Sequence, residues 1–241
     1  MVEGNVVTLA DAANLHTFVD AFRFIGDNPS FLAQKAWEQL QLSGAALGLA
    51  LLVALPLGVV LGHLHRGSSL AIGASIVGRG LPSLVLIAAF LTVLGIGFVN
   101  NMVALAVLAT GPILTNAFDG VEGVDRDAVE SARGMGMTGL QILRRIELPL
   151  ATPLLFTGIR VAAVTVVATA PIAAIAGGGG LGDIIVNQAS YRLSGVLGAS
   201  LCVMALSAGV FVALLGIQIG VTPRPLRRTS VGGDIPRKEL E

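Results

Sequence analysis

The chain has 241 residues, of which 54% are hydrophobic and only 12% are charged, with no net charge and a mean hydropathy of +0.83. A typical soluble domain has about 25% charged residues, so this composition excludes a soluble domain and indicates a protein embedded in a lipid bilayer. The length allows one domain, and the single cysteine, Cys202, excludes a disulfide framework and a multi-cysteine metal site.

Residues 1–41 precede the first long apolar block, and we expect them to form an N-terminal extracytoplasmic or interfacial tail. Pro29 interrupts this segment, and Ser30 is positioned to cap a helix that runs into the membrane. Before Pro29, apolar residues recur at helical spacing, which predicts an amphipathic helix at the membrane surface, with a partly disordered tail as the alternative. These residues are Leu15, Phe18, Phe22 and Ile25.

Five largely uncharged stretches within residues 42–221 form the predicted transmembrane domain, because a helix needs about 20 apolar residues to cross a bilayer core. We place the spans at about 42–62, 72–94, 99–118, 153–176 and 196–219. A tight turn is expected between the second and third spans. It contains Gly95, Gly97, Asn100 and Asn101.

Polar residues near the ends of these spans are expected at the membrane interface. His63, His65 and Arg66 follow the first span, and two histidines two residues apart do not share a helix face, so a metal site is not expected. Arg79 and Arg160 are expected to extend toward the lipid headgroups. Pro171 predicts a kink in the fourth span.

Residues 177–183, GGGGLGD, contain the spacing G-x-G-x-x-G. No strand precedes them and no lysine follows to complete a phosphate-binding loop, so we expect a bend or re-entrant turn instead of a nucleotide site. The chain also lacks a Walker motif and a set of catalytic or metal-ligating residues at suitable spacing. We therefore expect no enzyme activity, no cofactor and no metal in this chain.

The longest polar stretch, residues 119–149, lies between the third and fourth spans. Asp125 is positioned to cap a first helix over 126–133, and Gly134 and Gly136 interrupt it. Thr138 and Gln141 have the spacing of a capping box that opens a second helix. Pro149 ends that helix or sets its exit angle. The result is a short helix-turn-helix against the membrane face.

Within this stretch, residues 130–149 (ESARGMGMTGLQILRRIELP) resemble the EAA loop of permease subunits in binding-protein-dependent ABC importers. Ser131 stands where that family usually has alanine. The resemblance implies an all-α integral membrane fold like that of type I ABC importer permeases, with about five transmembrane helices and a cytoplasmic coupling helix. It assigns ATPase coupling to Glu130, Ser131, Ala132, Gly136, Ile146, Leu148 and Pro149. From the same pattern we expect close approach of another chain segment at Gly136.

The resemblance also implies partners. They are cytoplasmic ABC ATPase subunits, which would hold ATP and magnesium, a second permease subunit that is identical or paralogous, an extracytoplasmic substrate-binding protein and the bilayer, with no nucleic acid. Segments 80–97, 109–125 and 173–185 resemble the osmoprotectant group, which imports glycine betaine, choline, carnitine or proline. The alternative substrate is methionine or another amino acid. The alternative function is that of an ion-coupled transporter or a channel. The substrate path is not predicted.

The aromatic content also bears on the substrate. The chain has one Trp and one Tyr and no aromatic cluster in its sequence, so a cage for a quaternary ammonium group is expected on the binding protein.

Basic residues set the expected orientation. Twelve of the fifteen Lys and Arg residues fall on the side of the 119–149 loop, including those of a solvated tail at 222–241. Because cytoplasmic loops carry an excess of Lys and Arg, we expect a multi-pass protein of a bacterial or archaeal cell (inner) membrane, with the N-terminus outside and the loop and C-terminus in the cytoplasm.

Overall fold

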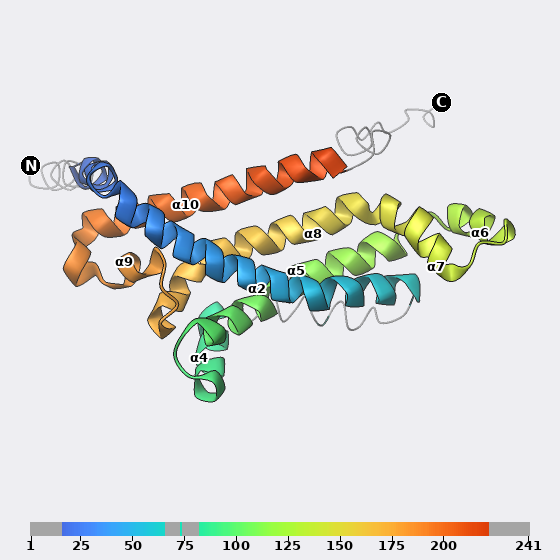
Figure 1. The fold of residues 1–241 in the computed structure, drawn as a ribbon, viewed down its shortest axis with the longest axis horizontal. Helices are drawn as coiled ribbons and strands as arrows, with labels where there is room; N and C mark the ends of the chain where they lie inside the picture. The colour runs from blue at the N-terminus through green and yellow to red at the C-terminus, as the bar shows by residue number, and fades with distance from the viewer. Residues whose placement is uncertain (1–15, 66–72, 74–81, 222–241) are drawn as a thin grey trace, which may run out of the picture.

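The computed structural model describes residues 16–65, 73 and 82–221, and throughout this part of the chain the regular structure is helical, with no β-strand. Four helical stretches are long and apolar enough to cross a membrane, namely Pro29–His63, Phe98–Glu122, Gly139–Ala176 and Gln188–Val221. They run side by side along the long axis of the molecule (Figure 1). The expected all-α membrane fold is confirmed.

A helix over residues 16–27 comes first among the described residues. The elements that follow are α2 (Pro29–His63), α4 (Ser83–Leu94), α5 (Phe98–Glu122), α6 (Arg126–Gly134), α7 (Gly139–Ile142), the π-helix η1 (Leu143–Glu147), α8 (Leu148–Thr169), the 3-10 helix η2 (Ala170–Ala176), α9 (Gly182–Val186) and α10 (Gln188–Val221).

Helix α2 begins at Pro29, well before the predicted start of the first span at residue 42. Proline suits the first turn of a helix, where its missing N–H would have had no partner. The 35 residues of α2 are more than the roughly 20 that a bilayer core requires, so the helix extends beyond the hydrocarbon. Residues 29–41 therefore continue the first transmembrane helix.

The predicted second span, 72–94, is only partly described, because 72 and 74–81, including Arg79, lie outside the described residues. The C-terminal part of this predicted span forms α4, an apolar helix of 12 residues. The turn after it is confirmed at Gly95 and Gly97, which have φ of 75° and 138°. Asn100 and Asn101, predicted in the turn, instead lie buried in α5.

The two asparagines are accommodated in α5 because backbone carbonyls accept their side-chain N–H groups. Asn101 Nδ2 donates to the carbonyl oxygens of Gly97 (2.9 Å) and Ala176 (3.1 Å). Asn100 Nδ2 donates to the carbonyl oxygen of Ile87 at 3.4 Å. These bonds connect α5 to α4 and to the end of η2.

Small residues bring α2 and α5 into close contact. A Cβ added to Gly58 would lie 2.7 Å from Ala117 Cβ, and one added to Gly62 would lie 2.8 Å from the carbonyl oxygen of Phe118. Lipid tails are as apolar as the helices, so association inside a membrane depends on such close packing. The contact places the end of α2 beside the end of α5, where the 119–149 stretch begins.

Arg160 connects α8 and α10. Its guanidinium donates to Gln218 Oε1 at 3.0 Å and lies 5.0 Å above the ring of Phe211. The structure therefore holds Arg160 between two helices, where the sequence predicted that it would extend to the headgroups. Pro171 lies where α8 gives way to the 3-10 helix η2, so the predicted irregularity occurs as a change of helix type.

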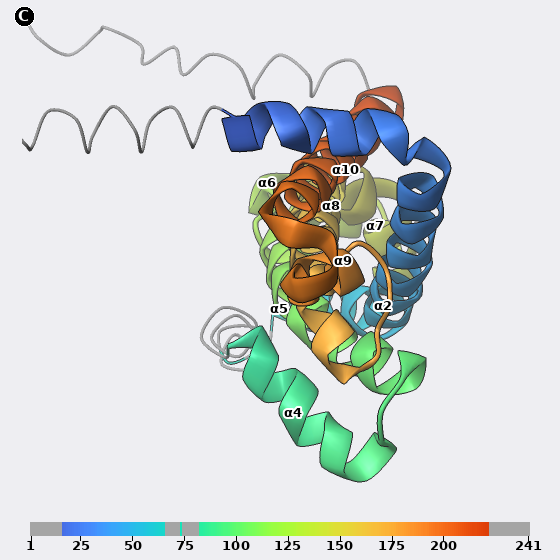
Figure 2. The ribbon, with the colours of Figure 1, turned by 90° about the vertical axis from the view of Figure 1, so that its left-hand side faces the viewer.

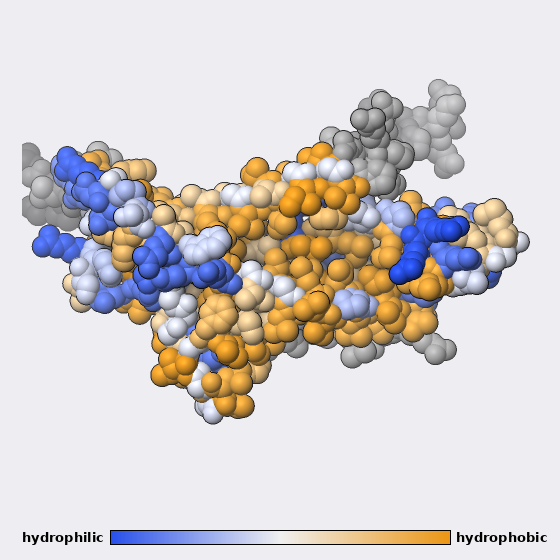
Figure 3. All heavy atoms as spheres, viewed as in Figure 1, coloured by the Kyte–Doolittle hydropathy of each residue, from blue (hydrophilic) through white to orange (hydrophobic). Residues whose placement is uncertain are grey.

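The surface of the bundle is apolar along its middle and hydrophilic at its two ends, as expected for a protein that crosses a bilayer (Figure 3). At the end remote from α6 and α7, the helix over residues 16–27 lies across the bundle (Figure 2). Phe18 and Phe22 of the predicted apolar stripe are exposed, whereas Ile25 packs against the buried cluster of Leu32, Leu181, Ile184 and Ala199. Leu15 lies outside the described residues.

An aromatic cluster at this end corrects the expectation that the chain has none. The ring of Tyr191 lies 6.0 Å from that of Phe31 and 6.4 Å from that of Phe24. The three residues belong to three different helices, so their spacing in the sequence does not indicate contact. Because the rings pack against one another, they form part of the core.

Candidate functional site

The loop between α5 and α8 extends from one end of the bundle as a pair of short helices (Figure 1). The predicted caps of both helices are present. Asp125 Oδ1 accepts from the N–H of Asp127 at 3.0 Å at the start of α6, and the N–H of Thr138 donates to Gln141 Oε1 at 2.8 Å at the start of α7. These bonds satisfy N–H groups that have no partner within a helix.

Gly136 ends α6 through its left-handed backbone conformation, with φ of 81°. The N–H of Gly136 donates to the carbonyl of Arg133 (3.0 Å), and that of Met137 to the carbonyl of Ala132 (3.2 Å), which is a Schellman motif. A Cβ placed on Gly136 would meet no atom within 4 Å. Within this chain the position requires glycine for its φ angle, so the expected close approach is not seen.

The Glu-Ser-Ala triplet of the resemblance lies on α6. Ala132 is fully buried, whereas Glu130 and Ser131 are exposed. Because Ala132 lies against the rest of the loop and its neighbours face outward, this helix presents a polar surface that includes Glu130.

The second half of the motif passes through η1 into α8. Ile146, Leu148 and Pro149 are half-buried, and the N–H of Leu148 donates to the carbonyl of Leu143, five residues back. Pro149 lies in the first turn of α8, so the prediction that it ends the second helix is wrong. Pro149 has no N–H to donate to the preceding turn. The chain accommodates it with the wider turn of the π-helix η1, which comes immediately before α8.

A buried acid in this segment has a partner on α2. Glu147 is 2% exposed, and its Oε2 lies 2.6 Å from Nδ1 of His63. His63 is the last residue of α2, so the expectation that it follows the first membrane helix is wrong. The two residues are separated by 84 positions in the sequence, so the contact could not be predicted from their spacing.

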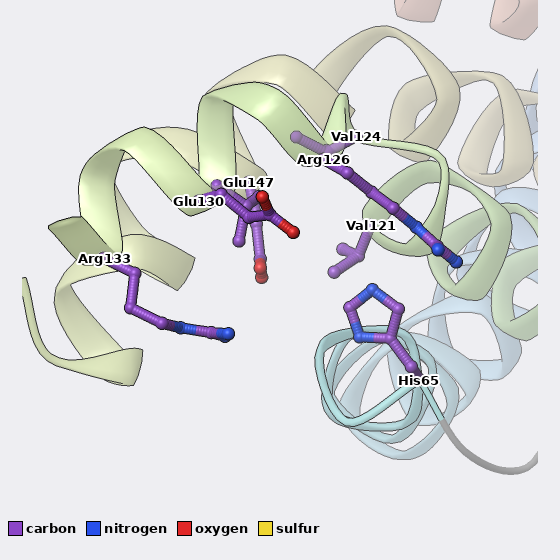
Figure 4. Close-up of a pocket in the computed structure, with 8 residues that line it drawn as sticks. His65, Val121, Val124, Arg126, Glu130, Arg133 and Glu147 are labelled. Carbon is purple, nitrogen blue, oxygen red and sulfur yellow. The ribbon is translucent and has the colours of Figure 1, made fainter.

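A cavity of about 320 Å³ lies between α6 and the adjacent ends of α2 and α5. Figure 4 shows Glu130, Arg133 and Glu147 directed toward the same space above His65. The remaining lining residues are Val121, Val124, Arg126 and Val129. Among the described residues, no salt bridge joins Arg126 or Arg133 to Glu130, so the charges of these three side chains remain available to a partner.

The outermost turn of the loop carries two large apolar side chains. Met135 is 75% exposed and Leu140 is 61% exposed. They flank the turn between α6 and α7, remote from the apolar middle of the bundle.

The glycine-rich turn lies at the other end of the bundle and is confirmed as a turn, with positive φ at Gly177, Gly179 and Gly180. Glu38 of α2 accepts from the N–H of Gly180 at 3.1 Å. Lys35 Nζ lies 2.7 Å from Asp183 Oδ2, so two bonds hold this turn to α2. Within residues 16–65, 73 and 82–221, no group of three His, Cys, Asp or Glu side chains has an arrangement that could hold a metal ion.

Comparison with known proteins identifies the family. The profile of the family described as "Binding-protein-dependent transport system inner membrane component" matches residues 54–222. The chain belongs to this family. The resemblance inferred from the 130–149 loop is thereby confirmed, and this permease is a transport component that is not itself catalytic.

Relatives of this inner membrane component carry names from osmoprotectant transport. The carnitine transport permease protein OpuCB of Listeria monocytogenes is 37% identical over 212 residues, 88% of this chain and 97% of the relative. The glycine betaine/carnitine/choline transport system permease protein OpuCB of Bacillus subtilis is 36% identical over 205 residues, 85% of this chain and 94% of the relative.

A solved structure supports the type I permease fold. A chain of the MetNI methionine ABC transporter, in an inward-facing conformation, has a TM-score of 0.69 and covers 80% of this chain and 96% of that chain. At 24% identity, this likeness shows the fold alone.

Proposed function

We propose that this chain is the permease subunit of an ABC importer that moves a small osmoprotectant such as glycine betaine, carnitine or choline, driven by ATP hydrolysis in separate subunits. The loop between α5 and α8 is the observation that carries the proposal. It is a capped, well-defined helical hairpin that extends from the bundle and exposes Met135 and Leu140. Such a hairpin suits a docking surface for a cytoplasmic ATPase.

In this proposal the motif residues have two kinds of role. Glu130 and Ser131 are exposed and contact the ATPase, while Ala132 and the glycine at 136 hold α6 in shape. Ile146, Leu148 and Pro149 position the hairpin on α8. ATP and magnesium bind the partner ATPase.

The substrate class is supported by the names of the relatives and by the composition of the spans. The five predicted spans contain no Asp or Glu, so the path offers no fixed anion that would hold a quaternary ammonium tightly. Selectivity then resides in an extracytoplasmic binding protein, where aromatic faces attract such a cation. A second permease subunit completes the path, and α10, which is largely exposed, offers a surface for it.

Orientation follows from the basic residues. The loop side carries twelve of the fifteen Lys and Arg residues, which supports a cytoplasmic loop and C-terminus and an N-terminus outside the cell membrane.

The test is to purify the chain with the ATPase and the binding protein from its own cells, reconstitute the complex and measure ATP hydrolysis with each solute. Glycine betaine, carnitine or choline is expected to raise the rate, and methionine is not. Stimulation by methionine alone would contradict the osmoprotectant substrate but leave the importer architecture intact. Failure to retain an ATPase would contradict the architecture itself.

A further inference from the structure

The hydrogen bond between His63 and Glu147 joins a transmembrane helix directly to the segment that follows the coupling hairpin. Nδ1 of His63 and Oε2 of Glu147 are 2.6 Å apart and share one hydrogen bond, in which the direction is set by the tautomer of the imidazole. From this geometry we propose that the pair is the link through which a displacement of the hairpin reaches α2. This role rests on the proposed docking of an ATPase at the hairpin.

The packing around the pair separates α6 from α2. Helix α6 packs mainly on α7 and η1, whereas α2 packs mainly on α5 and α8. A cavity of about 320 Å³ lies between α6 and the ends of α2 and α5. A movement of α6 therefore reaches α7 and η1 by direct contact, and the bond from Glu147 of η1 to His63 passes it directly to the end of α2, in addition to the packing of α2 on α5 and α8.

The immediate surroundings hold both partners in place. Glu147 is 2% exposed, and His63 is the side chain that bonds to its carboxyl group at the edge of the cavity. On the other side of the imidazole, a Cβ added to Gly139 would lie 3.4 Å from Nε2 of His63, so the ring lies close against the start of α7. His63 thus bonds to η1 and lies near the start of α7, and these are the two elements on which α6 packs.

The end of α2 transmits this displacement because it is tightly packed against its neighbour. At Gly58 and Gly62 the backbone of α2 lies so close to α5 that an added Cβ would lie 2.7 and 2.8 Å from the nearest atoms. A close-packed interface moves as a unit and does not deform continuously. His63 and Glu147 are therefore positioning residues for coupling, and neither touches nucleotide or solute.

The functional test uses the reconstituted complex of permease, ATPase and binding protein with glycine betaine. His63→Ala and Glu147→Ala are each expected to retain the ATPase during purification but to lower the betaine transported per ATP hydrolysed by about tenfold. The double variant should be no worse than either single variant, because one bond is lost in all three. His63→Gln and Glu147→Gln keep a donor and an acceptor and are expected to recover part of the ratio. His16→Ala, at an exposed histidine at the far end, is the control.

A distance measurement separates transmission from a general loss of structure. Spin labels at Leu64 and Asp127, which are both exposed, report on the end of α2 and the start of α6 in a Cys202→Ser background. When ATP binds the complex, the distance between the labels is expected to stay constant in the unaltered pair, because both labelled sites move together. In His63→Ala and Glu147→Ala it is expected to change.

The outcomes distinguish this link from the proposed function. An unchanged distance and an unchanged transport ratio in both alanine variants would overturn the link. Loss of the ATPase from the variants would also overturn it, since the pair would then serve docking. If Glu147→Ala fails to insert, His63→Ala and Glu147→Gln decide between these results. Failure of the unaltered chain to retain an ATPase would overturn the proposed function, and the link with it.

Discussion

Lys35 of α2 and Asp183 of α9 are separated by 148 positions, and Lys35 Nζ lies 2.7 Å from Asp183 Oδ2. The contact brings the first transmembrane helix to the segment that follows the glycine-rich turn. Lys35 also lies 2.9 Å from Glu38 Oε2, which accepts from the N–H of Gly180 at 3.1 Å. Three charged side chains thus hold one end of the bundle together, as His63 and Glu147 do at the other.

The first prediction concerns the glycine-rich turn. Glu38→Ala removes the acceptor of the Gly180 N–H, and we expect amide hydrogen exchange over residues 177–182 to rise by roughly fivefold, the equivalent of ~1 kcal/mol for a partly exposed bond. Mass spectrometry of the exchanged complex measures this. Gln41→Ala, at an exposed position of the same helix, is the control, and an equal rise in both variants would contradict the role of Glu38.

The second prediction concerns Gly136. Position 136 requires a residue that can adopt a φ of 81°. Gly136→Ala should therefore impair uptake almost as much as Gly136→Leu. Gly136→Asn should retain more uptake, because asparagine tolerates the left-handed region. Uptake of labelled glycine betaine by cells that contain each variant, at equal amounts in the membrane, is the measurement. Normal uptake with Gly136→Ala and loss only with Gly136→Leu would show that space, and not backbone conformation, is decisive.

The third prediction concerns the exposed apolar turn of the hairpin. Met135→Ser and Leu140→Ser are expected to reduce the amount of ATPase that co-purifies by about tenfold when combined, because the two side chains lose their apolar contact area in the complex. Insertion into the membrane should not change. Val186→Ser, at an exposed valine on the far end of the bundle, serves as the control. Undiminished ATPase in the double variant would place the docking surface elsewhere.

The fourth prediction concerns orientation. In a Cys202→Ser background, a cysteine at Asp20 should react with a membrane-impermeant thiol reagent in intact cells, and one at Asp127 of α6 should react only after the membrane is permeabilised. Both side chains are exposed, and neither belongs to the apolar turn of the hairpin, so differences in burial do not account for the result. The opposite labelling pattern would reverse the orientation and remove the basis for an ATPase at the hairpin.

Local sequence determined most of the helical architecture and the family. Apolar stretches long enough to cross a bilayer predict the spans, and caps such as Asp125 and Thr138 depend on residues two or three positions away, so their hydrogen bonds follow from spacing alone. The same applies to the EAA-like motif, whose residues lie within twenty positions. The glycine-rich turn was also predictable, because a run of glycines disfavours a helix whatever surrounds it.

The elements that failed prediction are those whose outcome depends on contacts between distant segments. Asn100 and Asn101 resemble helix breakers, yet in α5 their amides reach the carbonyl oxygens of other elements. Pro149 resembles a helix end, yet a π-helical turn precedes it and the chain continues into α8. For the asparagines, hydrogen bonds to other elements offset a local preference, whereas for Pro149 a wider turn within the same segment does so.

Sequence alone therefore determined that this chain crosses the membrane and carries a loop that resembles the EAA loop, because those properties depend on composition and on neighbours along the chain. Only the tertiary structure decided which residues connect that loop to the membrane helices. His63 and Glu147 come together because small residues such as Gly58 and Gly62 let α2 approach α5, and this approach carries the end of α2 to the start of α8. Neither His63 nor Glu147 stands out from its neighbours in the sequence. The two residues form a pair only because the fold brings α2 and η1 together.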